Sequence, residues 1–273
     1  MTEWTAFTVE ISEHVARVTL IGPGKSNAMG PAFWRELPEI FRELDRDREV
    51  RAVVLTGSGK NFSSGLDLFG MGELLDPVMG DDVKAAPRTK FLDEIRAMQA
   101  SITAVAECRK PVVAAVSGWC IGGALDLIAA ADIRLASADA KFSLREAKVA
   151  IVADMGSLQR LPGVIGEGHL RELAFTAKDI DAKRAEKIGL VNDVYADQGA
   201  VLEAAHDLAR DIAENPPLVV QGIKDVLETR TAPVVAEGLR YVSTWNAAFL
   251  PSLDLVEGIA AVRQKREPAF EGR

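Results

Sequence analysis

The feature that most constrains this fold is an uncharged run that ends in a carboxylate. Residues 111–125, PVVAAVSGWCIGGAL, carry no charge, and Asp126 follows them directly. The residues around Asp126 have the composition of an apolar helix, where burying an unpaired charge costs on the order of several kcal/mol. Asp126 therefore either belongs to a functional site or is paired internally by a backbone donor or a cation. The sequence leaves both interpretations open.

Size and charge limit the class of protein. A chain of 273 residues with 48% hydrophobic content can bury a large core and allows one or two domains. The net charge of -8 argues against a nucleic-acid partner, because binding to phosphate backbones normally needs a basic surface. The uncharged run is shorter than the roughly 20 residues of a membrane helix and contains three glycines, so we expect no membrane partner.

The cysteines and the first residues indicate a cellular compartment. Cys108 and Cys120 form no CxxC or zinc-ligand pattern, which favours structural thiols in a reducing compartment. Residues 1–5 carry an acid instead of the basic start of a signal peptide. We therefore expect a cytoplasmic protein. No metal site is expected either, because the histidines lie far apart without ligand spacing. They are His14, His169 and His206.

Strands and helices alternate over residues 1–199, which predicts an α/β layered core. The predicted strands are 7–11, 15–21, 51–56, 112–116, 133–136 and 141–144. The predicted helices are 31–47, 90–108, 122–130 and 157–161, and the predicted loops are 57–65 and 76–88. Pro38 lies inside the first helix and is expected to kink or divide it.

Residues 200–273 predict helices alone. The predicted helices are 202–214, 217–229, 234–248 and 253–266. About 70 residues are few for an independent core. We therefore expect this helical region to pack on the first part of the chain or on another subunit.

Two glycine-rich turns, 63–67 and 119–123, each follow a buried strand. Each can leave backbone N–H groups unpaired at a helix start, and two such donors that converge on one point form an oxyanion hole. Ordinary turns are the alternative interpretation. Neither turn matches a dinucleotide-binding or a phosphate-binding glycine motif.

Two further carboxylates lie in largely apolar surroundings. Glu146 follows a short strand and could be a solvated strand end, whereas Asp154 could be the N-cap of the helix predicted at 157–161. Together with Asp126, however, they could have different pKa values and supply separate acid and base roles.

On these residues the chain resembles the crotonase, or enoyl-CoA hydratase/isomerase, superfamily. The matching segments are 27–29, 62–68, 118–132, 159–162 and the helical tail. The resemblance covers nearly the whole chain. It implies a spiral of ββα units with a helical C-terminal trimerisation region, and a homotrimer or a dimer of trimers. It also implies an acyl-CoA thioester as the substrate, with no separate cofactor because CoA is part of that substrate.

The same resemblance assigns residues to substrate binding. It implies that the N–H groups of Leu66 and Gly123 hold the thioester oxygen, where negative charge builds as an enolate forms; each such donor contributes roughly 10² to 10³ in rate. Ser64 and Asp67 are expected to bind substrate beside this oxyanion hole. Lys265, or its neighbour in the last helix, is expected to meet CoA phosphates, with a solvated basic helix end as the alternative.

The carboxylate pattern resembles that of the dienoyl-CoA isomerases, which have acids at the positions of Asp126, Glu146 and Asp154. Hydratases usually have Glu at the first two positions and commonly Gly at the third. The resemblance implies that Glu146 removes a proton from C2 of a 3,5-dienoyl-CoA in fatty acid β-oxidation, that Asp154 serves C6, and that Asp126 tunes or positions them. The roles of Glu146 and Asp154 could be exchanged.

Two other functions remain open. The first is an enoyl-CoA hydratase that uses Asp126 and Glu146 to activate water. The second is a non-catalytic or RNA-associated member of this fold, against which the acidity of the chain and its three carboxylates weigh. The C-terminal residues 270–273 carry no peroxisomal tail, in line with the cytoplasmic expectation.

Overall fold

The computed structural model describes residues 3–22, 26–68, 70, 78 and 84–273, and its core is a six-stranded sheet. In spatial order the strands are β1 (Phe7–Ser12), β2 (Val15–Leu20), β3 (Ala52–Gly57), β4 (Val112–Val116), β6 (Ile133–Ser137) and β9 (Asp193–Tyr195). The hairpin β1–β2 is antiparallel, and the pairs from β2 to β9 are parallel. A second, three-stranded sheet contains β5 (Trp119–Ile121), β7 (Lys141–Ser143) and β8 (Ile180–Asp181).

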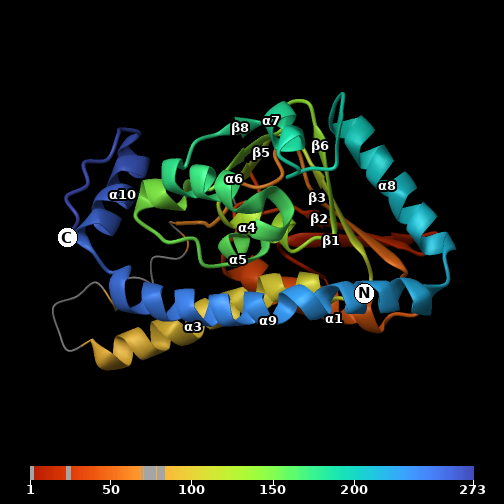
Figure 1. The fold of residues 1–273 in the computed structure, drawn as a ribbon, viewed down its shortest axis with the longest axis horizontal. Helices are drawn as coiled ribbons and strands as arrows, with labels where there is room; N and C mark the ends of the chain where they lie inside the picture. Colours follow the sequence, from red (N-terminus) through yellow and green to blue (C-terminus); the bar gives the residue numbers. More distant parts are fainter. Residues whose placement is uncertain (1–2, 23–25, 69, 71–77, 79–83) are drawn as a thin grey trace.

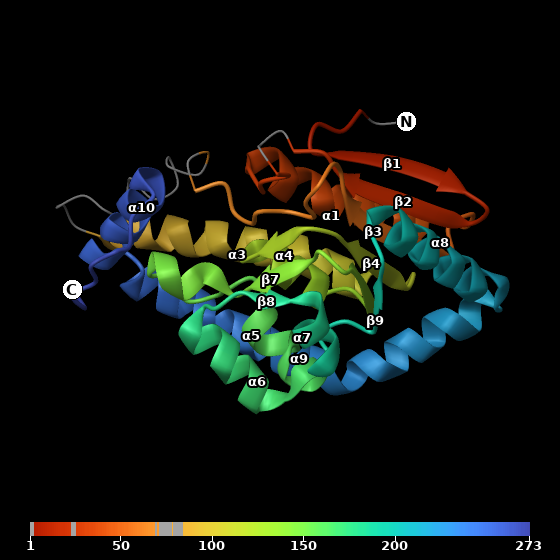
Figure 2. The same cartoon turned by 90° about the horizontal axis from the view of Figure 1, so that it is seen from above.

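Helices cover both faces of the large sheet (Figure 1 and Figure 2). One face packs against α8 (Gln198–Glu214) through small and β-branched side chains. The opposite face contributes to the main core with α1 (Pro31–Arg46), α3 (Ala85–Glu107) and α4 (Gly123–Ala129). Because β3 and β4 are buried on both faces, their sequences are continuous apolar runs without alternation.

The remaining helices complete the fold around the second sheet. They are the 3₁₀ helix η1 (Arg145–Val149), α5 (Ser157–Arg160), α6 (Pro162–Thr176), α7 (Ala182–Lys187), α9 (Pro217–Phe249) and α10 (Leu253–Gln264). Helix α9 lies alongside α3, and α10 contacts η1 (Figure 2). The expected α/β core with a helical C-terminal region is therefore present. The division at residue 199 into two units stays a prediction.

Several sequence-based boundaries differ from the structure. The helices expected at 217–229 and 234–248 form one helix of 33 residues that runs through Pro233. A proline removes one helical hydrogen bond, but the second half of α9 is buried through Leu239 and Val242 and packs on α3, which keeps the helix continuous. Likewise α1 is not divided at Pro38, because its buried face extends on both sides of that residue.

Two further helices begin earlier than expected. Helix α3 begins at Ala85 and not at residue 90, and α8 begins at Gln198 and not at residue 202. The loop expected over 76–88 otherwise lies mostly outside the described residues. In the part of the chain that the structure describes, no helix combines the length and the apolar character needed to cross a membrane.

Candidate active site

The two glycine-rich turns meet in the structure. Ser63 forms an isolated parallel bridge with Cys120, and Met29 forms another with Leu66. A Cβ atom added at Gly65 would lie 2.4 Å from the carbonyl oxygen of Ile121, so only glycine lets the two backbones approach this closely. Gly65 also has a φ of +80°, a conformation that side chains disfavour.

The backbone amides of Leu66 and Gly123 are neighbours. A Cβ atom built on Gly123 would lie 3.8 Å from the amide nitrogen of Leu66. In the bridge to Met29, the Met29 N–H donates to the oxygen of Gly65, and the Asp67 N–H donates to the oxygen of Met29. The Leu66 N–H takes no part in this bridge. Gly123 is the first residue of α4, where an N–H has no partner within the helix. The structure therefore brings together the two donors that an oxyanion hole requires.

Asp126 is almost fully buried, with 1% of its surface exposed. Its Oδ1 accepts a 2.6 Å hydrogen bond from the backbone N–H of Ser157, the first residue of α5. Burial raises the pKa of Asp126, while the Ser157 N–H and the positive charge of Arg160 lower it. Asp126 is therefore paired by a backbone donor and lies beside the other carboxylates, and its role in a functional site stays a prediction.

Glu146 lies on η1, against the second glycine-rich turn. A Cβ atom added at Gly122 would come within 3.3 Å of Glu146 Oε1, so the glycine makes room for the carboxyl. The Oε2 atom is buried and has no donor among the described residues. Burial raises the pKa of Glu146 well above its ordinary value of 4.5, and the charges of Asp126 and Asp154 add to this effect. The carboxyl also shares a hydrogen bond with that of Asp126, which requires a proton on one of the two. Glu146 is therefore not a solvated strand end.

Asp154 is also buried, with 9% of its surface exposed, and it does not cap α5. The N-cap of that helix is Gly156, and the donor at the helix start binds Asp126 instead. Asp154 Oδ2 accepts a 2.6 Å hydrogen bond from Nδ2 of Asn246. Burial raises the pKa of Asp154 from 3.8 to about 7; the Asn246 hydrogen bond opposes this rise, and the charge of Asp126 adds to it.

Two buried amides around Asp154 were not found by sequence reasoning. They are Asn246 on α9 and Gln99 on α3, with 1% and 5% of their surfaces exposed. Gln99 Nε2 donates to the backbone oxygens of Asp154 at 2.7 Å and of Leu239 at 3.1 Å. Both lie far from Asp154 in the sequence, and a polar residue within a helix gives no signal of the carbonyl it will meet.

The other expected substrate-binding residues are less buried. Ser64 is exposed, and half-buried Asp67 accepts a hydrogen bond from the N–H of Gly70 at 2.9 Å. Lys265 is exposed and ends α10 with a φ of +54°. Its neighbour Arg266 pairs with Glu257. A role of Ser64, Asp67 or Lys265 in binding stays a prediction.

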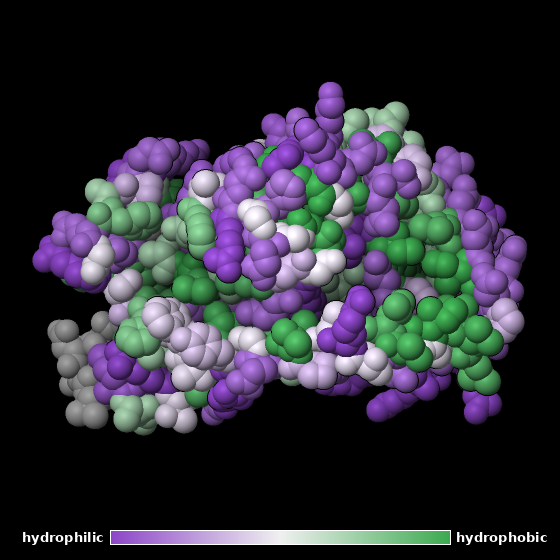
Figure 3. Space-filling model, viewed as in Figure 1, coloured by the Kyte–Doolittle hydropathy of each residue, from purple (hydrophilic) through white to green (hydrophobic). Residues whose placement is uncertain are grey.

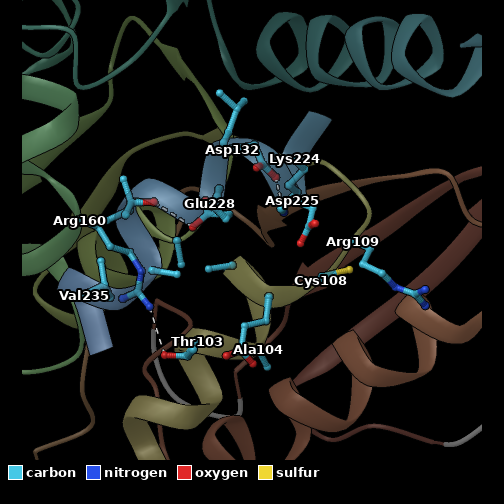
Figure 4. Close-up of a pocket in the computed structure, with 18 of the residues that line it drawn as sticks. Thr103, Ala104, Cys108, Arg109, Asp132, Arg160, Lys224, Asp225, Glu228 and Val235 are labelled. Carbon is cyan, nitrogen blue, oxygen red and sulfur yellow. Dashed lines mark hydrogen bonds and ion pairs between the residues drawn. The ribbon is translucent and has the colours of Figure 1, made fainter. Parts of the chain in front are cut away.

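A large groove of about 1590 Å³ lies between α9 and the body of the protein (Figure 4). Its lining includes Arg160, which donates to Thr103 at 3.1 Å, and Lys224, which pairs with Asp132 at 2.7 Å. None of the three carboxylates lines it. Arg160 connects the two regions, because its charge acts on Asp126. Within the described ranges, no group of three or more His, Cys, Asp or Glu side chains is placed to hold a metal ion.

Comparison with known proteins identifies the family of the chain. Residues 10–273 match the family model described as enoyl-CoA hydratase/isomerase. The chain belongs to the enoyl-CoA hydratase/isomerase family. It is similar to a solved enoyl-CoA hydratase/isomerase from Pseudoalteromonas atlantica, with a TM-score of 0.84 and 25% identity over 98% of this chain and 100% of the other. The family and the crotonase-like fold expected from the sequence are thus confirmed.

The curated relatives are more specific. A protein from Dictyostelium discoideum named mitochondrial Delta(3,5)-Delta(2,4)-dienoyl-CoA isomerase is 43% identical over 95% of this chain and 88% of its own length. A peroxisomal protein of the same activity from Arabidopsis thaliana is 40% identical over 91% of this chain and 89% of its own length. The cytoplasmic expectation is therefore wrong, since these relatives are named mitochondrial and peroxisomal. Cysteine usage reports only a reducing environment and does not distinguish among compartments.

Proposed function

We propose that this family member converts 3,5-dienoyl-CoA to 2,4-dienoyl-CoA, as an isomerase of fatty acid β-oxidation. The observation that carries the proposal is Asp154, a third buried acid whose charge acts on Glu146, the acid that lies against Gly122 beside the two neighbouring amides. The names of the relatives support the same activity. A hydratase needs no acid at this position, because water supplies the atoms that are added.

The proposed reaction moves one proton along a conjugated chain. The C2–H bond breaks, its electron pair enters the conjugated system, and negative charge collects on the thioester oxygen. The N–H groups of Leu66 and Gly123 stabilise that charge. Protonation at C6 then shifts the double bonds to C2 and C4. No cofactor is needed, because CoA arrives as part of the substrate.

The two carboxyls that carry the proton must start in different states. One accepts the proton from C2 as a carboxylate, and the other donates a proton to C6 as an acid. We assign Glu146 to C2 and Asp154 to C6. With a pKa raised to about 7, Asp154 holds a proton in a large share of molecules at neutral pH. Asp126 positions Glu146 and tunes its proton affinity by sharing one proton with it, and Glu146 is the carboxylate that accepts the C2 proton when this shared proton lies on Asp126.

A comparison of two substrates tests the proposed function. We expect kcat/KM for a 3,5-dienoyl-CoA to exceed that for a 2-enoyl-CoA by about 10²-fold or more, the range that one proton-transfer group contributes. The appearance of the conjugated thioester, followed spectrophotometrically, measures the first reaction, and loss of the 2-enoyl chromophore measures hydration. Faster hydration than isomerisation would favour the hydratase instead.

We also propose that the protein is a homotrimer or a dimer of trimers. A compact monomer of this mass exposes about 11,500 Å², whereas this chain exposes 13540 Å². Figure 3 shows hydrophobic side chains gathered over the first half of α9. These residues include Leu218, Val219, Ile223, Val226 and Leu227, which are between 57% and 83% exposed. Apolar patches of this kind mark association surfaces.

A charge placed in this patch is expected to weaken the assembly. Val226→Glu would put a carboxylate into the apolar contact, at a cost of roughly several kcal/mol if it became buried. Sedimentation velocity should then show smaller species at concentrations where the wild type is fully assembled. Ile11→Glu adds the same charge at a partly exposed site on β1 and should leave the assembly intact. A wild type that sediments as a monomer would contradict the proposal.

A further inference from the structure

The buried amide of Asn246 is held in one orientation by two acceptors. Its Nδ2 donates to the backbone oxygen of Val152 at 2.8 Å and to Asp154 Oδ2 at 2.6 Å. A flipped amide would place its oxygen against both acceptors, and two acceptors cannot bond each other. Asn246 must therefore donate to Asp154, and both of its N–H bonds are used.

This contact leaves the two oxygens of Asp154 unequal. Oδ2 is occupied by the Asn246 N–H, so a proton on the carboxyl is carried by Oδ1. The bond also favours the ionised carboxylate, since an N–H donor binds a charged acceptor more strongly than a neutral one. It thus works against the burial that raises the pKa of Asp154.

The charged groups that face Asp154 do not stabilise its ionised carboxylate as the Asn246 N–H does. Asp126 from α4 and Glu146 from η1 are acids, and a negative charge on either of them opposes the ionisation of Asp154. Arg160 from α5 acts on Asp126. From α3 and α9 the neighbours are the neutral amides of Gln99 and Asn246. Gln99 donates to the backbone oxygens of Asp154 and Leu239 and not to the Asp154 carboxyl.

We propose that Asn246, on the C-terminal helix α9, is a positioning residue that directs the proton of Asp154 to Oδ1 and stabilises the ionised form of that carboxyl through its N–H. This inference deepens the proposed isomerase function and rests on it. It gives α9 a part in catalysis, because the helix that covers α3 also determines the protonation state of the acid that distinguishes an isomerase from a hydratase.

The test is the pH profile of kcat in a matched pair of variants. In the wild type, the limb of the profile near pH 7 reports the ionisation of Asp154. Asn246→Leu removes the donor to the carboxyl and should move this limb upward by about 1 to 2 pH units, the shift expected for the loss of one hydrogen bond to a charged group. Gln99→Leu removes another buried amide, which donates to the backbone oxygens of Asp154 and Leu239 but not to the carboxyl. It should leave the position of the limb unchanged, even if kcat falls.

A nearly isosteric variant guards against misfolding of the leucine variant. Asn246→Asp replaces two donors with acceptors, so the limb should move upward at least as far as in Asn246→Leu. Thermal melts at pH 5 and pH 8 check that each variant is folded. A limb that stays in place in a folded Asn246 variant, or that moves equally in Gln99→Leu, would overturn the inference. A wild type without isomerase activity would instead refute the proposed function, so the two failures are distinguishable.

Discussion

Replacing Asp154 with asparagine is expected to lower kcat for 3,5-dienoyl-CoA by about 10²- to 10⁴-fold, the contribution of one general acid or base. The amide is close in size to the carboxyl but cannot carry the proton to C6. KM should change little, because the proposed oxyanion donors Leu66 and Gly123 remain in place. Steady-state kinetics with the dienoyl substrate provide the measurement.

The pH profile gives this prediction a second readout. Since burial raises the pKa of Asp154 to about 7, the wild-type profile should have a limb near that pH, and Asp154→Asn should lose it. Asp193→Asn, an exposed change on β9, serves as the control and should behave like the wild type. Full isomerase activity in Asp154→Asn would refute the proposed role of this residue.

Replacing Glu146 with glutamine is expected to have a comparable effect on catalysis and an opposite effect on stability. Without a carboxylate at C2, kcat should fall by about 10²- to 10⁴-fold. The folded protein, however, no longer has to bury a third acid beside Asp126 and Asp154. The glutamine amide can also donate a hydrogen bond to Asp126, where two carboxyls must otherwise share a proton.

The stability effect has a defined dependence on pH. The pKa of Glu146 is raised in the folded state, so below its ordinary value of 4.5 the group is protonated in both states and costs nothing. As the pH rises above that value, the unfolded chain releases the proton first, and the free energy of unfolding falls. Asp154, raised in the same direction, adds a similar loss up to about pH 7.

Glu146→Gln should therefore unfold at nearly the same denaturant concentration as the wild type near pH 4. At pH 8 it should be more stable by on the order of 1 kcal/mol. Urea unfolding at the two pH values measures the difference. Glu186→Gln, an exposed change on α7, should show no such pH-dependent gain. At each pH, the free energy of unfolding of Glu146→Gln is compared with that of the wild type. A difference that favours the variant less at pH 8 than at pH 4 would contradict the burial of Glu146.

The sequence by itself determined the layered core, the family and the identity of the three acids. The apolar runs of β3 and β4 specify strands buried on both faces, since no polar face is present. Asp126 stands out for the same local reason, because it interrupts an uncharged run. The glycines of the two turns allow conformations and close approaches that other residues do not.

The tertiary structure alone decided how the acids differ. Asp126 receives the Ser157 N–H, Asp154 receives the Asn246 amide, and the Oε2 atom of Glu146 receives no donor among the described residues. The two hydrogen bonds join residues that lie 31 and 92 positions apart in the sequence. Local composition carries no information about such pairs. The same holds for the continuity of α9 through Pro233, which depends on packing against α3. Electrostatic differences of this kind arise from three-dimensional proximity and desolvation, which exist only once the chain has folded.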